Sequence, residues 1–452
     1  MLKELLTPEI IQLVRERKWA DLRQALIIWP PAEVADLIQS LESPERVLLL
    51  RFLPRRFSAE VFSELSPLLQ DELLKDLTNQ EIRRLLADLS PDDRTALMEE
   101  LPAEVSRKLI GLLSPEDLKE TQQLLGYPDG SVGRVMTPNF VDIRAEWKVK
   151  QALEHIRKMG RDSETINVVY VVDAEGKLLD DIQLRHLILA SPETPVESVM
   201  DRSFVSISAY SDQEEAVSMI KKYNYLALPV VDSIGVLLGI VTIDDLMDVA
   251  DVEVTEDFHR LGGVSVETHG EGPIESLRDA TVSLLFRRRI VWLVLLVFVN
   301  ILSGAGIALF ENIISSAVAL VFFLPLLIAS GGNAGAQAAT LMVRALATGD
   351  VKMNDWWRML GKEMLVSTTL GLTMGVAVSL VGFFRAGLQI GVIVATSMFL
   401  IVVTGSLVGL LLPFILRKVG KDPATASAPL VTSIADVSGV VIYFSIATQV
   451  LS

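Results

Sequence analysis

The sequence lacks cysteine altogether and contains only four histidines. Without cysteine the chain can form neither a disulfide framework nor a thiolate metal site. The histidines show neither HxH nor HxxxH spacing, which argues against a transition-metal site built on imidazole. They are His155, His186, His259 and His269. Any metal bound by this chain is therefore expected to be a hard cation held by oxygen.

Catalytic motifs and a secretory signal are also missing. No nucleophilic side chain is paired with a base, and no glycine-rich phosphate loop is present, so the sequence does not support an enzyme. Residues 1–19 mix Lys, Glu and Arg into their apolar pattern and lack the apolar core of a signal peptide. We therefore expect the soluble part of the chain to stay in the cytoplasm.

Charge is distributed very unevenly along the chain. Residues 1–275 contain 29 basic and 50 acidic residues, a net charge of −21. Residues 276–452 contain 12 basic and 7 acidic residues, a net charge of +5, and are strongly apolar. This division indicates an acidic soluble part that attracts cations, joined to a membrane part, and it makes nucleic acid an unexpected partner.

A twelve-residue repeat occupies residues 41–113. Serine-proline-acid steps that begin at Ser43, Ser90 and Ser114 predict helix starts, with serine as the cap and the acids at the positive end of the helix dipole. The repeat therefore predicts one short helix per unit, stacked as a helical solenoid over residues 1–126. Its leucines are Leu41, Leu53, Leu65, Leu77, Leu89, Leu101 and Leu113.

Beyond residue 126 the pattern changes to short strands that alternate with helices, in two copies that span 127–192 and 193–250. In each copy an apolar strand ends at an aspartate, Asp173 or Asp232, and a second strand follows at a similar spacing. Each copy also opens with a Val-Met step. The tandem resembles a pair of cystathionine-beta-synthase (CBS) domains, which are α/β modules that often bind adenosine nucleotides in that superfamily.

The second copy matches the nucleotide-binding pattern of the CBS superfamily more closely than the first. Its segment Gly239–Asp245 resembles the motif in which a threonine and a following aspartate reach ribose and phosphate. The first copy has Leu179–His186 where a glycine and an aspartate are expected. The resemblance implies ATP or a related adenine nucleotide at the CBS pair, and the alternative is a pair that acts only as a dimerising hinge. The implied nucleotide ligands are Tyr225, Pro229, Thr242 and Asp245.

An acidic helix and loop, residues 246–275, connect the CBS pair to the membrane part. A run of charges of this kind is usually a solvated helix face. Its place beside the membrane favours a second interpretation, in which the carboxylates sense cations near a channel mouth. These carboxylates are Asp248, Asp251, Glu253, Glu256 and Asp257.

Five charge-poor runs within residues 276–452 predict five transmembrane helices, because each can cross a hydrocarbon core of about 30 Å. Lys and Arg gather before the first run and in the loops after the second and fourth. By the positive-inside rule, the N-terminal domains are cytoplasmic and the C-terminus is outside the cell (inner) membrane. The five runs are 290–310, 312–343, 364–384, 386–416 and 423–452.

Asp436 is the only charged residue inside these five runs, and it lies near the middle of the last one. A charge at that depth is costly, so it usually faces a bundle interior or a watery path and marks an ion route. Thr432 and Ser433 precede Asp436 by four and three residues, which on a helix brings three oxygens to one stripe. The stripe is interpreted as a pore wall.

The second run contains a cluster of small residues with two amides, Asn333 and Gln337, on one helical face. One interpretation is close helix packing with the amides as polar contacts. The alternative makes this helix a second pore wall, and Gly331-Gly332 could loosen it so that backbone carbonyls reach an ion.

The whole order of these parts resembles the MgtE family of magnesium channels. The most specific matches are Gly331–Gln337 with Arg344–Thr348, and Pro429–Val431 with Ser433–Gly439. The resemblance implies a right-handed short-helix solenoid, tandem CBS α/β domains and a five-helix transmembrane domain. It also implies a homodimer whose second and fifth spans line a central pore, where Asp436 of each subunit holds hydrated Mg²⁺. The implied pore-lining residues are Asn333, Gln337, Pro429, Thr432 and Ser433.

The acidic soluble part suggests how such a channel is gated. Two strongly negative copies repel each other unless divalent cations lie between their carboxylates, and Mg²⁺ suits such oxygen sites because it keeps several waters. High cytosolic Mg²⁺ would compact these domains and plug the pore, whereas low Mg²⁺ would free it. By the resemblance, the sensor carboxylates are Asp92 or Asp93, Asp212, Glu214, Asp245, Asp248, Glu253, Glu256 and Asp257.

Alternatives remain at this point. Ala428 stands where the family commonly has Asn, which leaves the preference among Mg²⁺, Co²⁺ and Mn²⁺ open. A carrier coupled to Na⁺ or H⁺ would use Asp436 as a titrating relay. A single intramembrane charge favours the channel, because coupled carriers usually need more titrating groups. A membrane-anchored sensor of Mg²⁺ or adenylate levels, with no transport activity, is the alternative from another class.

Overall fold

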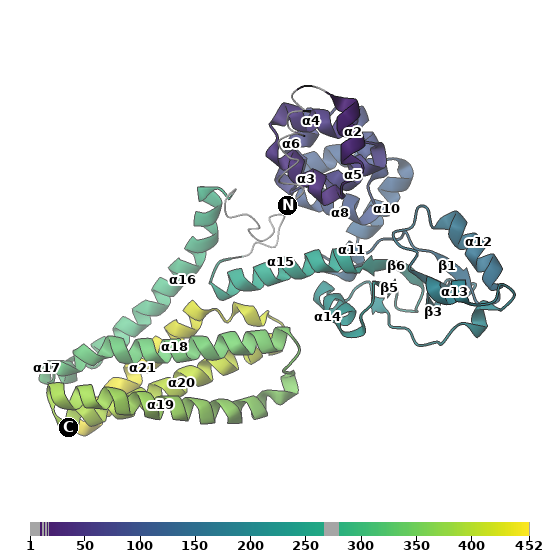
Figure 1. The fold of residues 1–452 in the computed structure, drawn as a ribbon. Coiled ribbons are helices and arrows are strands. Elements are labelled where there is room, and N and C mark those ends of the chain that lie inside the picture. Colours follow the sequence, from purple (N-terminus) through teal and green to yellow (C-terminus); the bar gives the residue numbers. More distant parts are fainter. Residues whose placement is uncertain (1–9, 11–12, 14–15, 17, 266–279, 452) are drawn as a thin grey trace. The chain divides into compact units, whose positions relative to one another are not determined.

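The structure is a computed structural model that describes the chain except residues 1–9, 11–12, 14–15, 17, 266–279 and 452 (Figure 1). It divides the chain into two compact units, Met1–Asp251 and Val252–Ser452. The predicted loop that ends at residue 275 falls largely outside the described residues.

The first unit begins with a stack of short helices, as the leucine repeat predicts. After α2 (Trp19–Leu26), eight helices begin twelve residues apart, and the repeat leucines from Leu41 to Leu101 are buried in one core. Each helix is too short to be stable alone and buries its apolar face against its neighbours. The eight are α3 (Pro31–Ser40), α4 (Ser43–Phe52), α5 (Arg55–Ser63), α6 (Pro67–Asp76), α7 (Asn79–Asp88), α8 (Pro91–Glu100), α9 (Ala103–Ile110) and α10 (Pro115–Leu125).

Two of the three predicted serine caps are confirmed. Ser90 and Ser114 accept the backbone N–H of the residue three positions on, at 3.3 and 3.1 Å. The prediction for Ser43 is wrong, because α4 already includes Ser43 and no side chain caps it. The Ser43 hydroxyl instead donates to the Asp76 carboxylate of a later repeat, at 3.2 Å.

Two small sheets follow, one in each CBS copy. In both sheets the first strand pairs parallel with the second, and the second pairs antiparallel with the third. The internal repeat is thus confirmed at the level of strand pairing. The strands are β1 (Asp142–Arg144), β2 (Val168–Val172), β3 (Leu178–Gln183), β4 (Ile207–Ser208), β5 (Ala227–Val231) and β6 (Leu237–Thr242). The helices among them are α11 (Val132–Val135), α12 (Val149–Met159), α13 (Leu184–Leu189), η1 (Val196–Ser198) and α14 (Gln213–Tyr223).

The two CBS copies form one body. Tyr170 of β2 shares a buried cluster with Ala227 of β5 and Ile240 of β6. Asp173 and Asp232 occupy equivalent turns, where each carboxylate accepts the backbone N–H groups two and four residues on. The helix α15 (Ile243–Leu261) starts directly after β6 and continues into the second unit.

Within the described part of the second unit, five helices are long and apolar enough to cross a membrane, as predicted. A short helix, α17, takes up the beginning of the predicted run 312–343, so the second span begins only at Ala319. The helices are α16 (Val282–Ala308), α17 (Glu311–Ser316), α18 (Ala319–Ala347), η2 (Met353–Asp355), α19 (Trp356–Ala386), α20 (Leu388–Lys418), η3 (Pro423–Thr425) and α21 (Ala428–Leu451).

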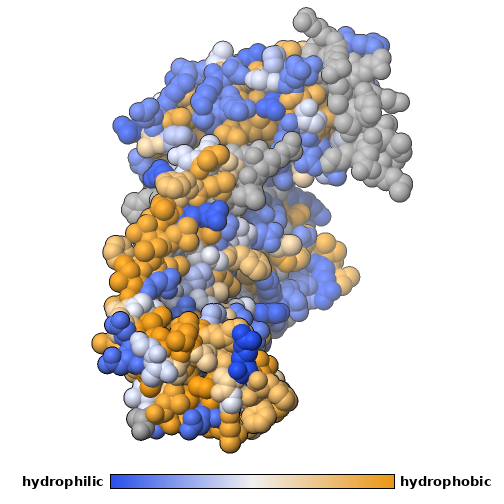
Figure 2. Space-filling model, turned by 90° about the vertical axis from the view of Figure 1, so that its left-hand side faces the viewer, coloured by the Kyte–Doolittle hydropathy of each residue, from blue (hydrophilic) through white to orange (hydrophobic). Residues whose placement is uncertain are grey.

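Glycines bring α18 and α20 into close contact. A Cβ on Gly405 or Gly409 would overlap the backbone carbonyl of Gly331 or Gly335 on α18. The helix α18 is continuous through these glycines, which favours the packing interpretation over a loosened helix. Exposed Leu, Val and Phe side chains cover the spans, and Figure 2 shows broad hydrophobic areas on the surface that suit contact with membrane lipid.

Candidate functional site

The Asp436 carboxylate is the charged centre of α21. Its side chain is partly buried, and within the described residues no hydrogen bond or ion pair engages it. A carboxylate in an apolar span without a protein partner requires water or a cation. The structure therefore keeps Asp436 as the first candidate ligand of an ion path.

The two amides of α18 lie beside the contact between α18 and α21. A Cβ on Gly332 would lie 3.2 Å from Cγ2 of Thr432, so the two helices meet at this level. Asn333, the next residue, and Gln337, one turn further on, are exposed. No protein group in the described chain hydrogen-bonds to either amide. Exposed amides within a membrane span are unfavourable against lipid, so they require a watery path or a second chain.

The hydroxyls near Asp436 do not all lie on one stripe. Thr432 and Ser433 both donate to the Pro429 carbonyl, at 3.0 and 2.9 Å. Thr432 is partly exposed and lies one turn before Asp436, whereas Ser433 is buried in the bundle. The exposed stripe therefore consists of Thr432 and Asp436, with the partly exposed Pro429 near its start.

A second carboxylate lies within the third span. The apolar run begins at Met364, but α19 begins earlier, at Trp356, because helix formation does not require apolar residues. Glu363 is thus a half-buried helical residue, and it accepts a hydrogen bond from Ser406, a buried residue of α20. The apolar runs alone predicted that Asp436 is the only carboxylate inside the spans. The longer helix α19 adds Glu363 as a second one.

An acidic cluster forms in the first unit, where α8 of the helical stack meets the start of α15. Asp92 is 8% exposed, and one of its carboxylate oxygens is buried without a hydrogen-bond partner. Its neighbours in the cluster include residues that the sequence did not single out, above all Glu164 and Asp244. The whole cluster is Glu64, Asp92, Asp93, Glu164, Asp244, Asp245 and Asp248.

Desolvation and mutual repulsion raise the pKa values in this cluster. Burial, with the neighbouring charge of Asp93, raises the pKa of Asp92 to about 6. Desolvation and the charges of Asp92 and Asp93 raise the pKa of Glu164 to about 7. Burial and the charge of Asp92 raise the pKa of Asp245 to about 8, although the Thr242 hydroxyl donates to its carboxylate. The charged carboxylates of the cluster therefore repel one another, and a bound divalent cation would reduce that repulsion.

The cluster is not a preformed cage. In the described ranges no group of three acidic or histidine side chains converges closely enough to hold an ion directly. Mg²⁺ usually keeps several waters and takes only one or two carboxylates directly, so a loose cluster suits a hydrated ion. A hollow of about 390 Å³ lies beside the cluster and is lined by Asp93 and Glu164 together with Arg56 and Arg161.

The other predicted sensor residues lie on different elements. The Asp212 carboxylate caps α14 by accepting the Glu214 N–H at 2.8 Å. Glu253 and Asp257 share the second half of α15, where burial and the charge of Glu253 raise the pKa of Asp257. Glu256 forms an ion pair with Arg260 one turn later on the same helix.

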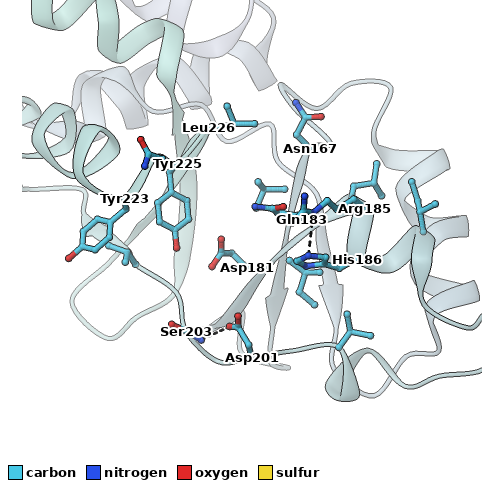
Figure 3. A pocket seen from close by; sticks show the side chains of 17 residues that line it. Asn167, Asp181, Gln183, Arg185, His186, Asp201, Ser203, Tyr223, Tyr225 and Leu226 are labelled. Atoms are coloured by element: carbon cyan, nitrogen blue, oxygen red, sulfur yellow. Dashed lines mark hydrogen bonds between the residues drawn. The ribbon is translucent and has the colours of Figure 1, made fainter.

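A cleft of about 730 Å³ opens between the two CBS copies (Figure 3). Tyr225 lies on one wall, and the Asp181 carboxylate of β3 also lines the cleft. Burial, with the charges of Asp180 and Asp201, raises the pKa of Asp181 to about 6. Arg185 and His186 lie on the opposite wall, so the cleft presents an aromatic ring, carboxylates and basic groups within one ligand-sized space.

Only one of the four predicted nucleotide ligands lines this cleft. Tyr225 does so, whereas Pro229, Thr242 and Asp245 do not. Thr242 ends β6 and Asp245 follows it in α15, where the carboxylate belongs to the acidic cluster. The departure of the first copy from the nucleotide pattern also has a structural explanation: the buried Asp180 accepts the N–H groups of Asp201 and Arg202 and fixes the linker between the copies.

Five long apolar helices, one of which carries a carboxylate with no partner among the described residues, joined to an acidic unit, are the arrangement expected of a membrane protein that transports cations. Family comparisons agree along the chain. The MgtE intracellular N domain matches residues 29–130, the CBS domain matches 132–193 and 196–251, and the MgtE divalent cation transporter domain matches 324–446.

Full-length relatives identify the family. The chain is 37% identical over 453 residues to the magnesium transporter MgtE of Thermus thermophilus, with 100% of this chain and 99% of the relative covered. It is 32% identical over 440 residues to the magnesium transporter MgtE of Bacillus subtilis, with 97% and 96% covered. The chain therefore belongs to the MgtE family of magnesium transporters, which is a transporter family and not an enzyme family.

Solved structures match the soluble part. The cytosolic domain of the Mg²⁺ channel MgtE in complex with ATP is 35% identical, with a TM-score of 0.51, and covers 54% of this chain and 100% of that domain. The soluble part of a magnesium transporter is 30% identical, with a TM-score of 0.53, and covers 56% of this chain and 99% of that structure.

Proposed function

We propose that this protein is a Mg²⁺-selective channel for magnesium uptake and that cytosolic Mg²⁺ closes it. The observation that carries the proposal is a set of polar groups on α18 and α21 for which the described residues supply no hydrogen-bond or ion-pair partner. Asn333, Gln337 and Asp436 lie on two helices in direct contact, in spans that are otherwise apolar. Such groups are stable in a membrane only where they meet water or a cation.

A second copy of the chain completes the path. The amides of α18 are exposed on the single chain, and a homodimer that brings two such faces together would enclose them away from lipid. The paired Asp436 carboxylates would then hold a hydrated Mg²⁺ between them, because this ion sheds its waters reluctantly. The basic loops favour an orientation with the N-terminal units in the cytoplasm and the C-terminus outside.

The acidic cluster supplies the gate. Its raised pKa values support a compact arrangement of α8 and α15 that is unfavourable while the carboxylates are charged. Mg²⁺ that binds only the compact arrangement stabilises it by mass action. At high cytosolic Mg²⁺ the helix α15 is then held in the position that closes the pore, and at low Mg²⁺ the start of α15 is released from α8.

The CBS cleft is proposed as the nucleotide site, in line with the relative whose cytosolic domain was crystallised with ATP. The fit rests on residues of this chain. The Tyr225 ring offers a stacking surface for adenine, Asp201 and Asp181 can accept ribose hydroxyls, and Arg185 faces them for the phosphates. A bound nucleotide would bridge the two CBS copies and so bias the gate.

A carrier coupled to another ion is the second candidate, because Glu363 adds a carboxylate within the spans. The Glu363–Ser406 hydrogen bond lies between α19 and α20, whereas the exposed amides and Asp436 lie on α18 and α21. Since this pairing serves the contact between two other helices, the channel remains the better-supported mechanism.

Uptake of Mg²⁺ into liposomes tests the pore assignment. Asp436→Ala should abolish uptake, because the path loses its only unpaired carboxylate. Glu311→Gln, which removes a charge from α17, is the matched control and should transport normally. Undiminished uptake by Asp436→Ala would show that the pore lies elsewhere.

A further inference from the structure

The last turn of α15 is fixed to the membrane unit by an arginine. The guanidinium of Arg260 forms one ion pair with Glu256, one turn earlier on α15, and a second with Asp422, in the segment between α20 and α21. All three side chains are mostly buried, with exposed fractions of 29% for Arg260, 17% for Glu256 and 30% for Asp422. Residues 252–452 form one compact unit, so these contacts lie within a single body.

Asp422 is held firmly in this arrangement. While one of its oxygens meets Arg260, the other accepts the Ala424 N–H at 2.7 Å and caps the short helix η3. The carboxylate therefore cannot turn away without uncapping η3. Sequence analysis did not single out Asp422, because its partner lies more than 160 positions earlier in the chain.

Apolar packing supports the same contact. Leu261, next to Arg260, packs against a buried cluster formed by Val343, Ala424 and Ala426. The chain then turns at Gly263, which has a φ of +69°, and a Cβ there would lie 3.3 Å from Pro429 at the start of α21. The end of α15 thus contacts the beginning of the helix that carries Asp436.

We propose that Arg260 is a built-in cation that holds the end of α15 on the α20–α21 segment at every Mg²⁺ concentration. The guanidinium stays protonated at all physiological pH values, and its planar fork can meet two carboxylates at once. It occupies the position that a divalent ion would need in order to bridge Glu256 and Asp422. We call Glu256, Arg260 and Asp422 together the latch. In this chain Glu256 is therefore part of a permanent contact and not a Mg²⁺ sensor.

The latch changes how the gate moves, an inference that rests on the channel proposed above. With its last turn anchored, α15 cannot leave the membrane unit as a whole when Mg²⁺ is removed. Movement is confined to the part before Glu256, where the acidic cluster lies. The helix would pivot about its anchored end, so that displacement at the cluster is transmitted to the start of α21.

Cysteine cross-linking tests the latch directly, because the chain has no native cysteine. The reporter is the full-length chain with Leu261→Cys and Ala424→Cys, treated with molecular iodine, which oxidises two thiols in contact to a disulfide, either in EDTA or in millimolar Mg²⁺. We expect equal cross-linking in both conditions. Adding Arg260→Gln should slow cross-linking up to about fivefold in EDTA, the upper end of the loss for a partly exposed ion pair. Mg²⁺ should restore cross-linking by bridging the two freed carboxylates.

Two controls make the outcome decisive. Arg260→Lys keeps the charge and should retain most of the cross-linking in EDTA. A second cysteine pair, Met342→Cys with Leu410→Cys within the buried contact of α18 and α20, reports whether each variant is folded. Cross-linking of the unaltered latch that requires Mg²⁺, or an Arg260→Gln chain that cross-links normally in EDTA, would overturn the proposal. The assay does not depend on transport, so failure of the channel proposal would be seen separately, in Mg²⁺ uptake.

Discussion

Removing the charge of Asp245 should let the acidic cluster close without Mg²⁺. This carboxylate lies at the start of α15, opposite Asp92 of α8, and burial together with that neighbouring charge raises its pKa to about 8. Asp245→Asn keeps the size of the side chain and its ability to accept the Thr242 hydroxyl. The substitution therefore removes repulsion with little change in packing.

The size of the effect follows from the pKa. An ordinary aspartate has a pKa of 3.8, and the value in the cluster is about 8. At about 1.4 kcal/mol per pKa unit, ionising Asp245 in the cluster costs up to ~6 kcal/mol more than in water. The side chain is partly exposed and solvent screens the repulsion, so we take about 2 to 3 kcal/mol as the effect. We call the helical stack docked when α8 lies against the start of α15, and undocked when the two are apart. The ratio of docked to undocked chains should rise roughly 30- to 150-fold in the absence of Mg²⁺.

Limited proteolysis of the full chain measures this ratio, because cleavage follows the population of the open form when opening is fast. The unaltered chain should be cleaved quickly in EDTA and slowly in millimolar Mg²⁺. Asp245→Asn should be cleaved slowly in both. Glu104→Gln, which removes an exposed carboxylate of α9, is the control and should keep the full Mg²⁺ dependence. An Asp245→Asn chain that EDTA still opens as readily as the unaltered one would refute the repulsion mechanism.

Two further predictions concern protons and nucleotides. Because the pKa values of Asp92 and Glu164 are raised to about 6 and 7, the docked arrangement binds more protons than the undocked one, and docking without Mg²⁺ should strengthen as pH falls from 8 to 6. The protection that Mg²⁺ adds against proteolysis should accordingly shrink over that range, and equal protection at both pH values would contradict the assignment. Tyr225→Ala should weaken ATP binding about 5- to 150-fold in calorimetry, since stacking on an aromatic ring contributes ~1–3 kcal/mol. Tyr210→Ala, outside the cleft, should leave binding unchanged, and normal binding by both variants would place the nucleotide elsewhere.

Local patterns in the sequence predicted much of the fold. The twelve-residue leucine repeat predicted the spacing of the helices, because each unit is long enough for one short helix and buries its leucine at the same position. The two CBS copies and the five spans followed from short apolar strands and long apolar runs. The failures concern boundaries. Ser43 became a helical residue instead of a cap, and α19 began before its apolar run and so took Glu363 into the span.

The site was predicted where one residue carries the signal and missed where distant segments meet. Asp436 stood out because a charge in an apolar run is unusual by itself. Glu164 joins the acidic cluster only through the docking of α8 against the CBS pair, and no local pattern marks it. Asp245 was assigned to nucleotide binding from a motif and to the Mg²⁺ sensor from the family resemblance, and the fold brings it close to Asp92 in the acidic cluster. The Arg260–Asp422 pair likewise depends on a tertiary contact that spacing cannot show.

Single-channel recording with Mg²⁺ varied on the cytoplasmic face tests the central claim most directly. With low cytoplasmic Mg²⁺, the reconstituted protein should show unitary Mg²⁺ currents far above the turnover of a carrier. Millimolar Mg²⁺ on that face should abolish them by closing the gate, and Asp436→Ala should show none under either condition. The absence of unitary currents, or currents that cytoplasmic Mg²⁺ leaves unchanged, would contradict the account of a Mg²⁺-gated channel.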